Sequence, residues 1–406
     1  MKILYVTGLW RGLRTILFEG QTEEMGMPAF MKPLKKLLLD GHDVDIFLIH
    51  KLDEYPPYDC KVDWISGDNI VDTYKWDVSL KGRFSNDWHI YQKTKQLLQQ
   101  KDYDIVYGHG DTSPAAAWAA KKLGVPYGQR IYGSFLDSHI QKHGKFLGGN
   151  RLIHDKWMFK NKQDFVLITN DGTRGDRTYA TLNAGKKKPS QMYFWINGVD
   201  PIADYDPDDS YGLDTSAFDV NEPFIFYFAR FQPEKGQLNA VEVLKKLRDK
   251  GISVKLVFGG QFSRGNYVDS VKQKVQEYGL EDQTVFLGQI NREQINALAK
   301  KAMVSAFFYY ASNMGNCFHE VFSAGGLVVS YNDGSLDDFI VSGETGFLAN
   351  SNEEAADIIG KIYTGEIDGE RIRQNAIACS REKMKSWDER VNDEIALLEQ
   401  YAGKRQ

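Results

Sequence analysis

Two cations stand in a short stretch where a predicted strand meets a predicted helix. In "FYFARFQPEKGQLNAVEVL" an apolar run ends at Arg230, and Lys235 lies just before the helix begins. A guanidinium and an ammonium group beside a helix N-terminus favour a diphosphate, because they neutralise the anion while free backbone N–H groups point at it. The alternative is that both are solvated surface cations beside a helix that Pro233 initiates. The stretch by itself leaves both interpretations open.

A carboxylate, Glu320, lies in a second stretch of interest, "SNMGNCFHEVFSAGG". We expect a helix to begin after the glycine-containing loop, so that the backbone N–H groups of residues 314–318 form a rim that attracts an anion. A carboxylate one turn into this helix repels phosphate, but it can accept hydrogen bonds from both hydroxyls of a ribose. A glutamate that only complements the helix dipole is the simpler alternative.

Glycines and a polar pair follow two further predicted strands. The run "KLVFGG" ends in Gly259 and Gly260, which permit either the close approach of a ligand to the backbone or only a tight turn. After "TVFLG" come Gln289 and Ile290, and a backbone peptide group at this strand end is a candidate for reading the edge of a base. An ordinary loop is an equal alternative there.

The strands that carry these residues belong to two alternating series. A chain of 406 residues is longer than one hydrophobic core usually grows. Buried apolar runs alternate with helical patterns in both halves, which predicts βαβ units and parallel sheets, with ligands at the carboxyl ends of the strands. The intervening stretch is rich in Asp and Pro. We expect a Rossmann-like domain at 1–198, a linker at 199–222, a second Rossmann-like domain at 223–385 and a C-terminal helix at 386–406.

Composition and charge narrow the class of protein. The chain is 42% hydrophobic, and its formal net charge of −5 gives no sign of a nucleic-acid-binding protein. Its three cysteines form no CxxC pair, which argues against a disulfide framework and a structural zinc site. The apolar N-terminal run is too short for a signal peptide, and no window approaches the roughly 18 to 20 apolar residues of a membrane span. We expect a cytoplasmic protein with no nucleic-acid partner.

Five motifs taken together resemble a known family. They are "NGVDP", "ARFQPEKG", "KLVFGG", "GLEDQTVFLGQI" and "HEVFSAGGLVVSYNDGSLDDFIVSGETGFL". In this order and spacing they resemble the C-terminal half of the retaining GT-B glycosyltransferases of family 4, the glycogen synthase-like or group 1 enzymes. The N-terminal half keeps the family's first strand, its "DGHDV" turn and its "DYDIVYGHG" strand, so the likeness covers nearly the whole chain.

The resemblance implies an α/β fold of the GT-B type, with two Rossmann-like αβα domains facing a central cleft and a C-terminal helix crossing back to the N-terminal domain. It also implies a nucleoside-diphosphate sugar as donor, with UDP favoured over GDP, bound mainly by the C-terminal domain. Arg230 and Lys235 then hold the diphosphate, and Glu320 matches the family's second paired glutamate, which binds the donor ribose. The remaining expected donor-binding residues are Gly259, Gly260, Gln289, Ile290, Ser312, Asn313, Met314, Gly315, Asn316 and Cys317.

Two positions depart from the family pattern. Eight residues before Glu320, where the family commonly has its first glutamate, this chain has Ser312, followed by Asn313. The family residue usually touches hydroxyls of the donor sugar, so the sugar's identity and orientation stay open. In "GQRIYGSF", Tyr132 stands where many members carry a histidine near the reacting carbon, and His109 in "YGHGD" is the alternative replacement.

The resemblance further implies transfer with retention of configuration and without a firm protein nucleophile. The leaving diphosphate, stabilised by Arg230 and Lys235, takes the acceptor's proton on the same face of the sugar. That arrangement requires neither a metal ion nor a cofactor. The "DVD" at 43–45 lies in a predicted strand and not in a metal-binding context.

The acceptor is expected to be a glycan or a lipid-linked molecule, bound by strand-end loops of the N-terminal domain. The long mixed segment after the first strand offers Arg11, Arg14, Glu19 and Gly26, and Asp111 follows a later strand. For any one residue of that segment, a flexible surface loop is the alternative.

A basic and aromatic stretch raises a separate hypothesis about membranes. Residues 139–162 interleave Lys, Arg and His with Phe, Leu, Trp and Met, and "GKKKP" follows at 185–189. Such a pattern suits peripheral contact with an anionic surface, here the inner membrane face, or with a lipid-linked acceptor. Solvated helix faces often have the same composition.

Three functions therefore compete. The first is a retaining sugar transferase, the second a nucleotide-sugar epimerase or hydrolase on the same fold, and the third a non-catalytic protein that binds a nucleotide sugar or glycan. The missing first glutamate leaves room for the second. Product formation that depends on an acceptor separates the first from the other two.

Overall fold

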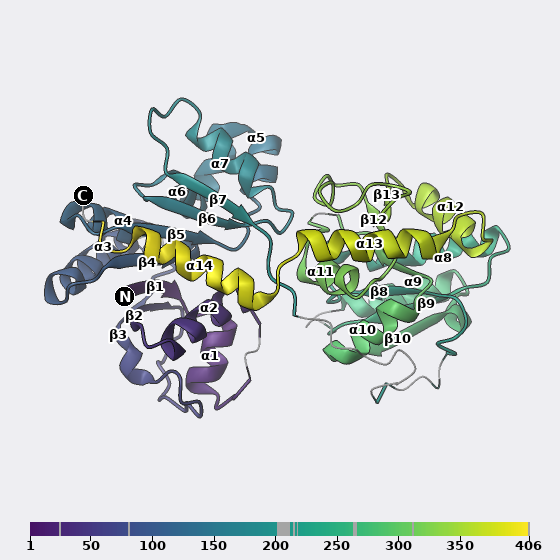
Figure 1. The fold of residues 1–406 in the computed structure, drawn as a ribbon, viewed down its shortest axis with the longest axis horizontal. Coiled ribbons are helices and arrows are strands. Elements are labelled where there is room, and N and C mark those ends of the chain that lie inside the picture. The colour runs from purple at the N-terminus through teal and green to yellow at the C-terminus, as the bar shows by residue number, and fades with distance from the viewer. Residues whose placement is uncertain are drawn as a thin grey trace. The chain divides into compact units, whose positions relative to one another are not determined.

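The computed structural model describes residues 1–23, 26–79, 82–200, 212–213, 216, 218–262, 266–310 and 312–404, without the side chains of 83–84 and 145–151. The chain forms two compact units (Figure 1). Unit 1 comprises Met1–Asn170, Arg174–Gly198 and Trp387–Gln406, and unit 2 comprises Asp171–Thr173 and Val199–Ser386. Most of the linker expected at 199–222 lies outside the described residues, so its boundaries stay a prediction.

Unit 1 is built on a parallel sheet of seven described strands, in the order β3-β2-β1-β4-β5-β6-β7. The strands are β1 Lys2–Gly8, β2 Asp43–His50, β3 Ile70–Lys75, β4 Ile105–His109, β5 Tyr127–Ile131, β6 Phe165–Thr169 and β7 Gln191–Trp195. The helices are α1 Arg11–Phe18, α2 Pro28–Leu39, α3 Gly82–Gln100, α4 Ala116–Leu123, α5 Leu136–Arg151, α6 Ile153–Lys160, α7 Gly175–Asn183 and α14 Trp387–Tyr401.

Unit 2 is built on a parallel sheet of six described strands, in the order β10-β9-β8-β11-β12-β13. The strands are β8 Phe224–Phe228, β9 Lys255–Gly259, β10 Thr284–Gly288, β11 Val304–Phe307, β12 Val328–Tyr331 and β13 Phe347–Ala349. The helices are α8 Gln237–Asp249, α9 Tyr267–Glu277, α10 Arg292–Lys301, α11 Asn316–Ser323, α12 Asn352–Tyr363 and α13 Gly369–Lys383.

The continuous apolar runs of the sequence explain why both sheets are parallel. All of β1 except its first residue is buried, as are all of β4, β5 and β6. A strand that is buried on both faces needs a helix on each side, and a helical crossover supplies it while returning the chain for the next parallel strand. The predicted α/β class, with two doubly wound sheets, is confirmed.

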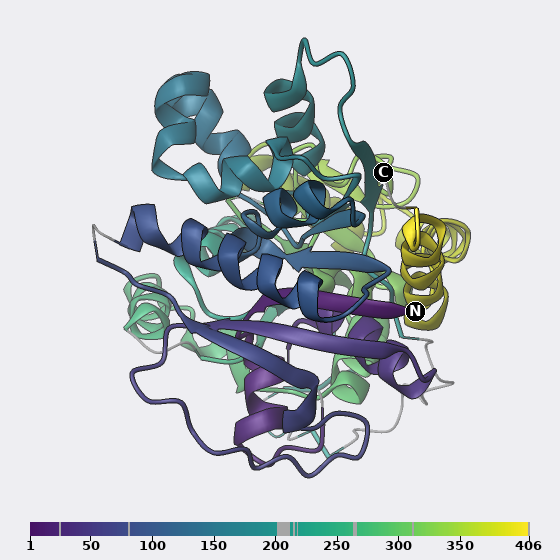
Figure 2. The same cartoon turned by 90° about the vertical axis from the view of Figure 1, so that its left-hand side faces the viewer.

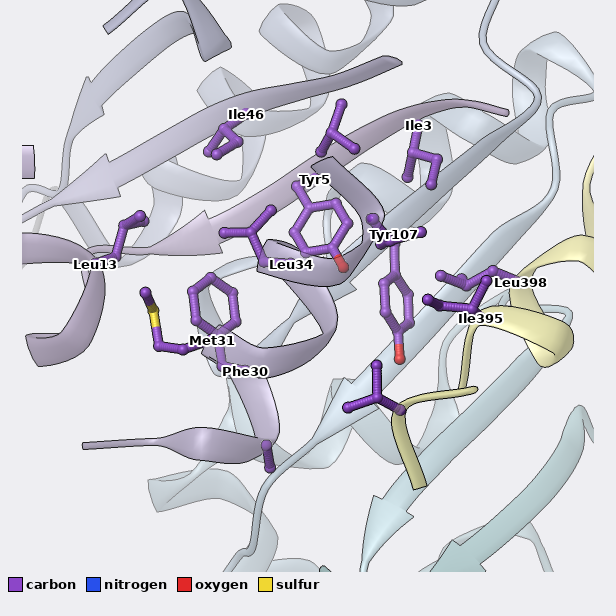
Figure 3. Packing of buried hydrophobic residues seen from close by; sticks show 14 of the residues in the cluster. Ile3, Tyr5, Leu13, Phe30, Met31, Leu34, Ile46, Tyr107, Ile395 and Leu398 are labelled. Atoms are coloured by element: carbon purple, nitrogen blue, oxygen red, sulfur yellow. The ribbon is translucent and has the colours of Figure 1, made fainter. Parts of the chain in front are cut away.

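The core of unit 1 is completed by the last helix of the chain. One face of the sheet packs against α1, α2 and α14, and Figure 3 shows Ile395 and Leu398 of α14 beside Tyr107 of β4. Seen from the side of unit 1, α14 lies in yellow near the start of β1 (Figure 2), and Ile3 belongs to the same cluster. The opposite face packs against α3 and α4.

The segment after β1 is more ordered than the sequence suggested. We expected a long mixed loop there, but residues 11–18 form helix α1, with Leu13, Ile16 and Leu17 buried. These three positions share one helical face, which supplies the burial that a short helix needs. Arg11 and Arg14 consequently lie on its exposed face.

Candidate active site

The strand order of each sheet fixes where a ligand is expected. In unit 1 the order reverses between β1 and β4, and in unit 2 it reverses between β8 and β11. Loops that leave neighbouring strands on opposite sides open a crevice at such a point, outside the carboxyl ends of the strands. Arg230 and residues 308–316 follow β8 and β11, whereas Trp10 and Asp111 follow β1 and β4.

Arg230 and Lys235 flank the turn between β8 and α8. Arg230 is exposed, Lys235 is half-buried, and within the described residues neither has an ion-pair partner. The Lys235 ammonium lies 4.1 Å from the centroid of the Tyr309 ring, which follows β11. Burial and then the neighbouring Arg230 lower the pKa of Lys235. Two adjacent cations without a protein counter-ion form a site that an anion would stabilise.

The Cys317 thiol lies within the electrostatic reach of these charges. It lies in the first turn of α11, and burial, followed by the nearby Glu320 carboxylate, raises its pKa to about 12. The Lys235 and Arg230 cations act on the same thiol in the opposite direction. The two cations and the carboxylate predicted from the sequence are therefore grouped around one side chain at the β8–β11 edge.

Glu320 is a carboxylate with little to stabilise its charge. Burial raises its pKa to about 7, against the pull of Arg292 and with a further push from Asp200. Those two residues form an ion pair of their own, with Arg292 Nη2 at 2.8 Å from Asp200 Oδ2. In the part of the chain that the structure describes, no hydrogen-bond donor reaches the Glu320 side chain. Hydroxyl donors from a ligand would supply what the protein does not.

The loop before α11 is held in place by side-chain hydrogen bonds. Asn313 is fully buried, and its side chain accepts from Tyr309 N at 3.1 Å and donates to Asp333 Oδ2 at 2.9 Å. Ser312 has a φ of 61°, in the left-handed region that few side chains adopt. Both side chains are thus engaged in holding the loop, because the half-buried Ser312 donates its hydroxyl to the carbonyl oxygen of Asp171.

The start of α11 offers backbone groups. Gly315 is the N-cap and has no side chain to bond the first free N–H groups of the helix. Met314, just before it, is fully buried, while Asn316 at the first helical position is exposed. The predicted anion-attracting rim at residues 314–318 accordingly falls on a true helix N-terminus.

The two strand-end glycines of β9 are explained by packing. A Cβ atom on Gly259 would lie 2.6 Å from Ile290 Cδ1, and one on Gly260 would lie 2.1 Å from the carbonyl oxygen of Ala229. Gly260 also has a φ of 132° and donates its N–H to Gly288. Gly260 therefore requires glycine for internal reasons, whether or not a ligand approaches, whereas a side chain at Gly259 would have to displace only the end of Ile290. Gln289 is exposed beside them, and half-buried Ile290 covers Gly259.

His109 and Tyr132 meet in unit 1. His109 Nδ1 lies 2.7 Å from the Tyr132 hydroxyl, and the His109 ring stacks on Tyr5 with centroids 4.4 Å apart. Burial, aided by the Arg130 cation, holds the pKa of His109 well below its usual range, so the ring is neutral. His109 is only 1% exposed, whereas Tyr132 is half-buried. Of the two predicted replacements for the family histidine, Tyr132 is the one that solvent reaches.

Beneath this pair lies a buried charge network that the sequence analysis missed. Arg130 Nε lies 3.4 Å from Glu394 Oε1, and the two side chains are 0% and 2% exposed. The Arg130 guanidinium lies 4.5 Å from the centroid of the Tyr132 ring. Glu394 also accepts from Tyr107 at 2.8 Å and from Arg390 at 3.1 Å. Helix α14 thereby supplies the counter-charge for a cation on β5.

The predicted acceptor residues are partly brought together. Arg14 and Asp111 line one pocket of about 250 Å³ at the carboxyl ends of β1, β2 and β4, with Trp10 and His50. Arg14 is paired with Glu19 at 2.9 Å. Arg11 lies on the exposed face of α1, and Gly26 precedes α2 with a φ of 85°. Neither of these two belongs to the pocket lining.

Two further observations concern metals and membranes. Over the described ranges, no group of three or more His, Cys, Asp or Glu side chains is arranged to hold a metal ion. No helix found there is long and apolar enough to cross a bilayer. In the basic stretch at 139–162, Met158 and Phe159 are buried in unit 1, while the side chains of 145–151 lie outside the described residues.

Comparison with known sequences gives a family for the C-terminal part. Residues 214–378 match the family model of the glycosyl transferases group 1. The glycosyltransferase YqgM of Bacillus subtilis is 24% identical over 282 residues, which are 68% of this chain and 73% of that protein. The alpha-1,3/1,6-mannosyltransferase ALG2 of Dictyostelium discoideum is 28% identical over 148 residues, or 35% of this chain and 33% of its own length.

Comparison with solved structures gives the fold of the whole chain. The sucrose-phosphate synthase of Thermosynechococcus elongatus matches with a TM-score of 0.70 and 18% identity, covering 98% of this chain and 99% of that one. HepE of Anabaena, solved in complex with UDP-glucose, matches with a TM-score of 0.64 and 17% identity, covering 98% and 99%. The chain therefore has the GT-B fold, and its residues 214–378 match the model of the glycosyl transferases group 1 family.

Proposed function

We propose that this protein is a retaining glycosyltransferase that moves a hexose-type sugar from a nucleoside diphosphate to a hydroxyl of a glycan, glycolipid or related acceptor. The observation that carries the proposal is the grouping of Arg230, Lys235 and Glu320 around Cys317 at the β8–β11 edge. Among the described residues the two cations have no ion-pair partner, which suits a diphosphate, and the Glu320 carboxylate has no hydrogen-bond donor, which suits a ribose. The group 1 match over the same unit supports this assignment.

The proposed chemistry relies on charge stabilisation. The bond between the sugar's anomeric carbon and the diphosphate oxygen breaks, and the electron pair leaves with the diphosphate beside Arg230 and Lys235. The acceptor oxygen bonds to the anomeric carbon on the same face, and its proton passes to an oxygen of the leaving diphosphate. Fixed cations that meet the developing charge lower the barrier for such a step. We propose that this needs no metal ion and no cofactor.

We propose UDP over GDP as the nucleotide of the donor. HepE, which shares the fold, has been solved with UDP and with UDP-glucose. The acceptor is proposed to bind unit 1, where Arg14 and Asp111 line a strand-end pocket. We also propose that the protein is cytoplasmic and makes peripheral contact with the inner membrane face.

The test is release of nucleoside diphosphate from a panel of UDP, GDP and ADP sugars, followed by chromatography with and without a mixed pool of sugar and lipid acceptors. We expect release from a UDP sugar that rises when acceptor is present. Free sugar or an epimer formed without acceptor would instead indicate a hydrolase or an epimerase. Binding of the donor with no turnover under any acceptor would indicate a non-catalytic protein. Addition of EDTA is expected to leave the rate unchanged.

A further inference from the structure

A second hollow lies on unit 1, away from its strand-end pocket. It has a volume of about 600 Å³ and lies among helices α3, α4 and α6. Four aromatic and four polar side chains form its lining, and they are Trp88, Tyr91, Trp118, Trp157, Asp87, Gln92, Lys95 and Lys122. None of these residues was predicted for the donor site or for the strand-end acceptor site, and only Trp157 falls in the basic stretch at 139–162.

The aromatic side chains present flat apolar surfaces to solvent. Trp88 is 58% exposed, and its ring stacks on Tyr91 with centroids 5.6 Å apart and an interplanar angle of 30°. Trp118 and Trp157 meet edge to face, with centroids 5.3 Å apart. Rings of this size usually bury most of their area, so an exposed indole in a hollow is an unused contact surface.

The polar wall is built around Asp87. This residue is only 8% exposed, and its Oδ2 lies 3.0 Å from His154 Nε2. His154 in turn lies against Trp157, with ring centroids 5.5 Å apart, so an aromatic neighbour fixes its position. Across the described residues the Asp87 Oδ1 atom has no hydrogen-bond donor, and it is left for a ligand.

This combination selects a class of ligand. A pyranose has C–H bonds on its faces and hydroxyl groups around its rim, so it needs flat apolar surfaces together with carboxylate, amide and ammonium partners. Two lysines, Lys95 and Lys122, line the hollow beside the Asp87 carboxylate, which His154 already contacts, so the charge of the lining does not repel an anion. The four aromatic rings, which make up half of the lining residues, instead favour a ligand with apolar faces over a bare phosphate. A membrane surface is disfavoured because the side chains line a depression, whereas residues that enter a bilayer project from the surface.

We propose that the hollow formed by α3, α4 and α6 binds a neutral oligosaccharide, as a saccharide site separate from the strand-end edges. The Trp88 face stacks on a sugar ring, and Asp87 and Gln92 accept and donate hydrogen bonds at its hydroxyls. The site goes beyond the proposed transfer function, because it can bind a glycan whether or not the chain transfers sugar to it.

The test is a tryptophan-fluorescence titration of the full chain with neutral gluco-, manno- and galacto-oligosaccharides of four to six sugars, backed by saturation-transfer NMR. We expect at least one series to bind, and Trp88→Ala to weaken it at least about tenfold, as expected when a stacking contact worth about 1.4 kcal/mol is lost. Gln92→Ala should weaken binding less. Leu39→Ala removes an equally exposed apolar side chain from α2 and should leave binding unchanged.

Two results would overturn the proposal. One is the absence of binding by every oligosaccharide, or binding that Trp88→Ala leaves intact. The other is co-sedimentation with vesicles of phosphatidylglycerol and phosphatidylcholine that Trp88→Ala abolishes, which would assign the aromatic residues to a membrane surface. With a monosaccharide as acceptor, the rate of UDP release from the donor should be the same in Trp88→Ala as in the parent chain. Failure of the saccharide site therefore stays distinct from failure of the proposed transferase activity.

Discussion

The two sheets of this protein treat charge at their strand ends in opposite ways. In unit 2, Arg230 and Lys235 follow β8 without an ion-pair partner among the described residues. In unit 1, the Arg130 cation on β5 is completely buried and is paired with Glu394. A cation that the protein leaves unpaired at an accessible edge is available to a ligand, whereas one paired in the interior serves the fold. The contrast separates candidate binding residues from structural ones without reference to any relative.

The largest expected effect tests the structural side of this contrast. Glu394→Ala leaves Arg130 buried without its carboxylate, which we expect to cost about 3–5 kcal/mol in the free energy of unfolding. Chemical denaturation of the purified chain measures it. Glu399→Ala removes an exposed carboxylate from the same helix and should change stability by less than about 0.5 kcal/mol. Equal losses in the two variants would contradict the structural role of the buried pair.

The next effect tests the binding side. Arg230→Ala and Lys235→Ala should each remove a charge-assisted contact to diphosphate worth about 1.5–3 kcal/mol, or roughly 10- to 100-fold in the Kd for UDP. Calorimetric titration measures the affinity, and the thermal midpoint should not fall in either variant. Lys361→Ala, which removes an exposed lysine from α12, serves as the matched control. Unchanged UDP affinity in both variants would remove the diphosphate assignment.

A smaller effect is expected where a hydroxyl supports a buried ring. Tyr132→Phe removes the partner of His109 Nδ1, and a buried polar atom left unsatisfied costs about 1–3 kcal/mol. Denaturation measures this loss, and UDP affinity should stay the same because Tyr132 belongs to unit 1. Tyr58→Phe breaks an exposed hydroxyl contact with Tyr55 and should be close to neutral. A fall in turnover at unchanged stability would instead make Tyr132 a participant in the reaction.

The smallest effect concerns pH. The pKa of Glu320 is raised from 4.5 to about 7 in the folded protein, so between those values the folded chain holds a proton that the unfolded chain has lost. Its contribution to stability is therefore fully present below pH 4.5 and is lost as pH rises through about 7. Glu320→Gln should match the parent chain near pH 5 and melt a few degrees higher at pH 8. Glu281→Gln, at an exposed position, should keep the parent's pH dependence.

Local patterns were enough to predict the class of the fold and the residues at the β8–β11 edge. Arg230 and Lys235 stand beside one strand end, so their proximity follows from the chain itself. Short strands and edge strands were not predicted. Strand β3 lies at a sheet edge and is mostly half-buried, and β13 has only three residues. Neither has the continuous apolar run that marks a central strand.

The buried charge network around Arg130 and Glu394 was not predicted for a different reason. Tyr107 and Glu394 are 287 residues apart in sequence, so no local pattern links them. A signal was nevertheless present in the last helix, where Glu394 shares the apolar face of Val391, Ile395 and Leu398. A carboxylate on a buried helical face requires a partner, and this requirement predicts a cation in the core without saying which one.

The position of helix α14 in the sequence determines which unit can finish folding first. Its core residues Val391, Ile395 and Leu398 belong to unit 1, yet they follow the whole of unit 2 in sequence. During synthesis on the ribosome, the part of the N-terminal sheet that α14 covers must therefore stay exposed, and Arg130 must stay without its carboxylate, until unit 2 has been made. Unit 2 is consequently the first that can fold to completion, although unit 1 begins first. We therefore expect the N-terminal unit expressed without α14 to be less soluble than the whole chain, since it exposes apolar surface that α14 covers.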